Sequence, residues 1–177
     1  NIYSIKCDDQ AATAEIVKNL ADRGHREIVY IYDVDSFSGL AKREGFRTGM
    51  EAAGLALTPH SVIKTEGGIT GGEMALERLD IRKTPYSAIV TSEDILAAGV
   101  LKALARRGRR VPEDVAVFGY NDSMIARCTT PELSTVDNKV GALAKAAANI
   151  LYRVLQGEVI RHHHTVNPQL IFRQSCP

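Results

Sequence analysis

Short apolar runs rich in β-branched residues alternate along this chain with longer stretches whose apolar residues recur at helical spacing. The run IVYIY at residues 28–32 is the clearest example, because nearly all of it is apolar. Strands of this kind are typical of sheets covered on both faces, and strands that alternate with helices form parallel sheets. The alternation therefore predicts an α/β fold with three layers, a parallel sheet flanked by helices.

The boundaries of the expected elements follow from apolar periodicity and from helix-closing glycines. We expect strands at residues 2–7, 28–32, 61–65, 87–91, 115–119 and 133–136, with 169–173 ending the sheet. We expect helices at residues 11–23, 38–53, 94–107 and 140–155. A further helix should run to about residue 79 after a flexible glycine-rich loop at 66–72, with Thr70 as its N-cap.

Two segments could suggest phosphate or metal binding. The glycine-rich loop lacks the Lys and Ser or Thr that a phosphate-binding loop needs after its last glycine, since Gly72 is followed by Glu73 and Met74. The three histidines at 162–164 could suggest a metal site, but neighbouring side chains of a strand point to opposite faces. We interpret them as the start of a strand and expect no metal site and no cofactor.

Composition narrows the class of partner. Lys plus Arg number 22 and Asp plus Glu 21, so the net charge of +1 provides no overall field for nucleic acid or an anionic membrane. The three cysteines are widely spaced, which suits a reducing cytoplasm, and no apolar run approaches the roughly 20 residues that span a bilayer. Because the chain starts with Asn1 directly before a strand-like run, we expect a fragment of a longer protein, with any DNA contact outside it.

Carboxylates follow several of the expected strands. They are Asp8, Asp9, Asp33, Asp35, Glu93, Asp94 and Asp122. Such groups could converge at one edge of the sheet, where they would hold a catalytic metal or accept hydrogen bonds from ligand hydroxyls. The Gly-x-Ser-x-Gly pattern of a nucleophile elbow is absent from the sequence. We therefore favour binding over catalysis and predict that the chain is not an enzyme.

The segment VPEDVAVFGYND at residues 111–122 resembles a signature region of the LacI/GalR transcription regulators. Further similar segments follow the family order: GHR at 24–26, EGFR at 44–47, AAGL at 52–55, DILAAG at 94–99, TPELSTV at 130–136 and LIFRQS at 170–175. Together they extend the resemblance over essentially the whole chain.

The resemblance implies a type I periplasmic-binding-protein-like fold, in which two α/β subdomains enclose an effector in a cleft. Residues 1–177 would then be a partial effector-binding and dimerisation domain without its helix-turn-helix DNA-binding headpiece. Residues from about 10 to 134 and from 158 to 177 would form the second subdomain. Residues 138–156 would supply a crossover helix of the first subdomain.

Five ligand-binding residues are implied by the same resemblance: Ser38, Lys42, Glu93, Asn121 and Asn138. Lys42 stands where the family has Arg, and a lysine offers a point charge in place of a planar fork. Glu93 replaces the Asn of an Ala-Asn-Asp motif, and Asn121 replaces a key Asp, so both change the hydrogen-bonding polarity. Asn138 matches a frequent Gln near the crossover, where a role in the hinge is an equal alternative.

These observations favour a small polar effector, a carbohydrate or a derivative of one, as the ligand. The resemblance further implies a cytoplasmic homodimer that contacts operator DNA only through the missing headpiece and has no membrane partner. Segment 66–68 lacks the aromatic residue on which many relatives stack their ligand. A periplasmic sugar-binding protein of a transporter is the main alternative, and a small metal-dependent hydrolase is a third.

Overall fold

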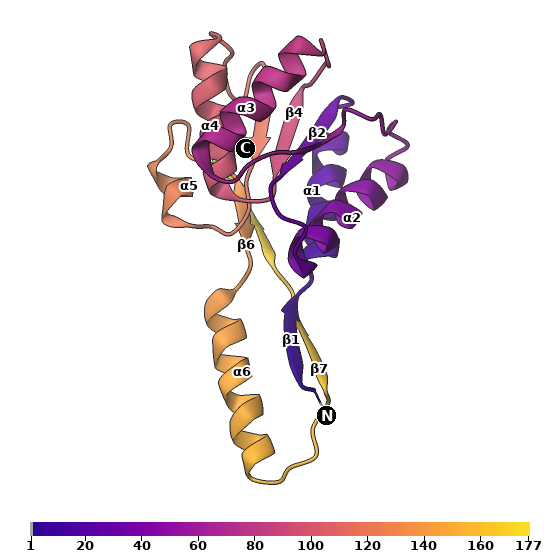
Figure 1. Ribbon diagram of the computed structural model, residues 1–177, viewed down its shortest axis with the longest axis vertical. Coiled ribbons are helices and arrows are strands. Elements are labelled where there is room, and N and C mark those ends of the chain that lie inside the picture. The colour runs from indigo at the N-terminus through magenta and orange to yellow at the C-terminus, as the bar shows by residue number, and fades with distance from the viewer. Residues whose placement is uncertain (1) are drawn as a thin grey trace.

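A four-stranded parallel sheet lies at the centre of the computed structural model, which describes residues 2–177. Its strand order is β3 (Val62–Lys64), β2 (Ile28–Tyr32), β4 (Ala88–Thr91) and β5 (Ala116–Phe118). Helices α1 (Asp9–Asp22) and α2 (Phe37–Ala52) pack on one face, and α3 (Gly68–Ile81) and α4 (Asp94–Arg106) pack on the other. Figure 1 shows this layered body in the upper part of the molecule, which confirms the predicted three-layer α/β fold.

The central strand β2 shows why its sequence is apolar throughout. Every residue of β2 is buried, because its side chains alternate between two helix-covered faces. Tyr30 faces the α1 and α2 side, where its ring stacks on Phe46 at a centroid distance of 5.3 Å. Ile31 faces the α3 and α4 side together with Leu76. Two separate apolar clusters thus hold the sheet in place.

A thinner part of the molecule extends away from this body (Figure 1). It contains β1 (Ser4–Cys7) paired in parallel with β7 (His163–Val166), and the helix α6 (Val140–Leu155) beside β1. Strand β6 (Thr135–Asp137), which leads into this part, pairs antiparallel with β8 (Gln169–Ile171). The prediction that residues 169–173 end the main sheet is therefore wrong, because β8 belongs to a separate two-stranded ladder.

The glycine-rich segment differs from its predicted form. Helix α3 begins at Gly68 with Gly67 as its N-cap, so Thr70 lies inside the helix and is not the cap. Glycines 71 and 72 are buried where α3 meets α4, and a Cβ on Gly72 would lie 2.2 Å from the carbonyl oxygen of Leu96. These glycines allow two helices to approach closely. A loop was predicted here because clustered glycines are also typical of loops.

Other boundaries agree closely with the sequence. Helix α6 has the predicted bounds, and His163 and His164 lie in β7, as the strand interpretation required. The short helix α5 (Met124–Cys128) was not predicted. No helix within residues 2–177 is long and apolar enough to cross a bilayer. Within the same residues, no group of three or more His, Cys, Asp or Glu side chains is arranged to hold a metal ion.

Candidate functional site at the carboxyl ends of the strands

Polar side chains gather where β1, β2, β4 and β5 end. Asp9 follows β1, Asp33 follows β2 and Glu93 follows β4, while the chain leaving β5 brings Tyr120. Helix α2 adds Lys42 from its second turn. The carboxyl ends of β2, β4 and β5 meet at one edge of the main sheet, the usual ligand-binding side of an α/β fold. Strand β1 belongs to the smaller pair with β7, and its end brings Asp9 to this edge. We call this group the strand-end cluster, comprising Asp9, Asp33, Ser38, Lys42, Ser92, Glu93, Tyr120 and Asn121.

Asp9 joins three elements within the cluster. Its carboxylate accepts a hydrogen bond from the Ser38 hydroxyl through Oδ2 and another from the Tyr120 hydroxyl through Oδ1, each at 2.7 Å. Only 8% of Asp9 is exposed. Burial and the neighbouring Asp9 carboxylate raise the pKa of Tyr120 well above its usual value, so its hydroxyl keeps its proton. The hydrogen bond from Ser38 to Asp9 likewise fixes the orientation of the Ser38 hydroxyl.

Lys42 is a buried cation, with 7% of the residue exposed. Its Nζ donates a hydrogen bond to the carbonyl oxygen of Ser92 at 3.0 Å and lies 3.9 Å from the centroid of the Tyr120 ring. Burial lowers the pKa of Lys42, and the nearby carboxylates, above all Asp9 and then Glu93, oppose that shift. The ammonium is thus directed towards a backbone carbonyl and an aromatic face, two groups that stabilise a cation.

Glu93 and Asp33 form the acidic part of the cluster. Asp33 accepts hydrogen bonds from the Ser92 hydroxyl at 3.2 Å and from the backbone N–H of Val34 at 2.9 Å. Among residues 2–177, the Glu93 carboxylate has neither a hydrogen-bond donor nor an ion-pair partner. Burial raises the pKa of Glu93, and the Asp33 charge raises it further. Glu93 is therefore available to a ligand that donates a hydrogen bond.

Asn121 and Asn138 contact each other directly. The amide Nδ2 of Asn138 donates to Oδ1 of Asn121 at 3.1 Å, and the backbone N–H of Asn121 donates to the carbonyl of Val136 at 2.9 Å. Asn121 has a φ of 106°, in the left-handed region that non-glycine residues seldom adopt. Strained backbone of this kind persists only where its surroundings hold it, and it is common at binding sites.

Other carboxylates predicted at this edge serve the fold. Asp94 accepts hydrogen bonds from the Thr135 hydroxyl at 2.5 Å and from the backbone N–H of Ser123 at 2.7 Å, and so ties the start of β6 and the N-cap of α5 to α4. Asp122 forms a 2.6 Å ion pair with Arg173 that is largely shielded from water. The structure thus separates structural carboxylates from those of the cluster, a division that strand-end position alone does not reveal.

Tyr120 and Ser92 are members of the cluster that sequence reasoning missed. Tyr120 lies inside the segment that carries the family resemblance, but no role of its own was predicted for it. Ser92 contributes its hydroxyl to Asp33 and its backbone carbonyl to Lys42. The rule that ligand sites lie beyond strand ends could have marked both residues, since each follows a predicted strand directly.

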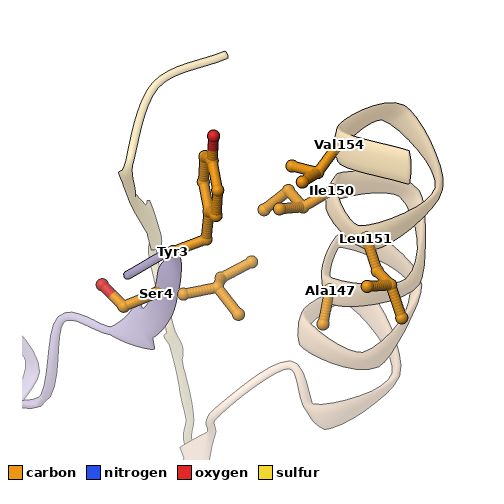
Figure 2. Close-up of a pocket in the computed structure, with 7 residues that line it drawn as sticks. Tyr3, Ser4, Ala147, Ile150, Leu151 and Val154 are labelled. Atoms are coloured by element: carbon orange, nitrogen blue, oxygen red, sulfur yellow. The ribbon is translucent and has the colours of Figure 1, made fainter. Parts of the chain in front are cut away.

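The cavity drawn in Figure 2 lies elsewhere in the molecule. It measures about 210 Å³ and is open between β1 and α6. Side chains from α6, among them Ile150 and Val154, face Tyr3 across it. The lining is mostly apolar, and no residue of the strand-end cluster takes part in it.

Comparison with known proteins identifies the family of the chain. The family described as periplasmic binding protein-like domain matches residues 17–176. An HTH-type transcriptional regulator of Lachnoclostridium phytofermentans is 34% identical over 98% of this chain and 52% of its own length. The regulator AscG of Escherichia coli is 31% identical over 98% of this chain and 52% of its own length. The chain thus spans about half the length of these relatives.

Solved structures agree with the sequence matches. A sugar-binding LacI-family regulator of Escherichia coli, solved with phosphate, has a TM-score of 0.89 at 31% identity over 96% of this chain and 61% of its own. A LacI-family regulatory protein of Chloroflexus aggregans has a TM-score of 0.92 at 26% identity over 100% of this chain and 64% of its own. The relatives named here are regulators and not enzymes. The chain therefore belongs to the periplasmic-binding-protein-like domain family, in the form found in LacI/GalR-type transcription regulators.

Proposed function

We propose that this chain is the sensing part of a transcription regulator and that a small polar effector, a sugar or sugar derivative, binds at the strand-end cluster. The observation that carries the proposal is the position of five polar residues, Ser38, Lys42, Glu93, Asn121 and Asn138, at or beside the ligand-binding edge of this fold. A related regulator, CelR, has been solved with cellobiose, at 25% identity to this chain.

In this proposal the protein acts by a shift between two conformations. The effector closes the cleft between the two subdomains, and the subdomains of each protomer of a homodimer change their relative position. The spacing of two helix-turn-helix headpieces on operator DNA then changes, and with it the affinity for DNA. The headpieces lie outside the present chain, and the protein works in the cytoplasm, where its DNA lies. Residues 10–134 and 158–177 belong to the second subdomain and 138–156 to the first.

The test uses the full-length protein of which this chain is a part. Its affinity for the DNA upstream of its own gene is measured by fluorescence anisotropy, with and without each sugar of a panel. We expect a sugar bound in calorimetry to change the DNA affinity at least fivefold, since coupling energies of about 1–3 kcal/mol correspond to 5-fold to 150-fold changes. A full-length sequence with a secretion signal and no headpiece would contradict the proposal and favour a transport receptor.

A further inference from the structure

The hydroxyl donors of the strand-end cluster are already committed to oxygens of the protein. Ser38 and Tyr120 each give their single hydroxyl hydrogen to Asp9, and Lys42 gives a hydrogen to the carbonyl of Ser92. A hydroxyl has one hydrogen to donate and two lone pairs to accept with. Once the hydrogen of Ser38 is held by Asp9, its oxygen can only accept. A ligand that meets Ser38 must therefore donate.

The carboxylates of the cluster have the same polarity. The Glu93 carboxylate has no donor among residues 2–177, and a carboxylate only accepts. Asp33 also offers carboxylate oxygens at this edge. The cluster contains three carboxylates, from Asp9, Asp33 and Glu93. It contains one buried cation, Lys42, which packs over the Tyr120 ring. The cluster therefore carries an excess of acceptors and of negative charge.

We propose that Asp9 is a positioning residue that sets this polarity, so that the site takes an uncharged or amine-bearing polyol and discriminates against phosphorylated and carboxylated sugars. The inference rests on the proposed function, because it concerns the same site. Hydroxyl and ammonium groups of such a ligand donate to Ser38 and Glu93. A phosphate or carboxylate has only acceptors to offer and meets like charges.

Asp9 is suited to this role because it has two equivalent acceptors. Its two carboxylate oxygens each hold one hydroxyl, from Ser38 and from Tyr120. An asparagine in its place has one oxygen and one NH₂ group, so one of the two hydroxyls loses its acceptor and is free to donate elsewhere. The substitution also removes a negative charge. Both changes favour anionic ligands over neutral ones.

The experiment measures binding to the full-length protein by calorimetry, with matched sets of probes. The sets are glucose, glucosamine and glucose 6-phosphate; ribose and ribose 5-phosphate; galactose and galacturonate; and cellobiose. In the wild type we expect binding by uncharged or amine-bearing members, with each anionic counterpart at least tenfold weaker. In Asp9→Asn we expect this ratio to fall at least fivefold. Asp22→Asn, an exposed position on α1, is the matched control and should leave the ratio unchanged.

Two further variants keep the test decisive if Asp9→Asn does not fold. Ser38→Ala removes the oxygen that receives the ligand and should weaken binding of the neutral sugar at least tenfold, with little effect on the anion. Tyr120→Phe leaves the Ser38 hydrogen on Asp9, so it should weaken both ligands together and preserve their ratio. Equal binding of neutral and anionic members, unchanged affinity in Ser38→Ala, or no binding by any probe would overturn the inference.

The DNA measurement separates this inference from the proposed function. A neutral sugar that binds with the expected discrimination but leaves DNA affinity unchanged contradicts the regulatory function and supports the polarity of the site. A sugar phosphate that binds tightly and changes DNA affinity supports the function and overturns the polarity.

Discussion

At the scale of single residues, Glu93 is a partly buried charge that no hydrogen bond or ion pair within residues 2–177 satisfies. Burial and the Asp33 charge raise its pKa above 4.5 in the folded protein, so the folded state binds a proton more readily than the unfolded state. Stability contributed by this group is present at low pH and is lost as the pH rises through the folded pKa. Glu93→Gln removes that loss and should raise the Tm at pH 7 by on the order of 1 °C, with a smaller effect at pH 4. Thermal unfolding at both pH values, with the exposed Glu77→Gln as control, checks this, and a lower Tm at pH 7 contradicts it.

At the scale of elements, the contact of α3 with α4 depends on glycine. A Cβ on Gly99 would lie 2.0 Å from the carbonyl oxygen of Ile69 and 3.1 Å from Cα of Gly72, so both helix backbones would have to separate. Overpacking of this kind costs about 1–3 kcal/mol, and we expect Gly99→Ala to lower the free energy of unfolding by that amount in urea titrations. Gly141→Ala on α6 is the matched control. Its added Cβ would meet nothing within 4 Å beyond its own stretch of helix, and alanine favours a helix by about 1 kcal/mol over glycine. Equal effects of the two substitutions would refute the packing argument.

At the scale of the whole molecule, α6 stands apart from the layered body and none of its residues is buried (Figure 1). Leu151 and Leu155 on this helix are 60% and 75% exposed. Contiguous exposed apolar surface drives association, so we expect the 177-residue chain by itself to self-associate in sedimentation velocity experiments. The double substitution Leu151→Lys and Leu155→Lys should shift it towards the monomer. The control Asn149→Lys adds a charge on another side of the helix and should leave the association unchanged. A wild-type chain that is monomeric would contradict this view.

The sequence by itself determined most of the elements and the edge of the sheet at which polar side chains gather. The apolar run of β2 and the periodicity of α6 are local patterns, set by burial on two faces and by the helical repeat, so their bounds were predictable. Only the tertiary structure decided which polar groups meet. The hydrogen bond from Tyr120 to Asp9 joins residues 111 positions apart, and no local pattern encodes such a contact. It depends on how packing positions β1 and β5 relative to each other.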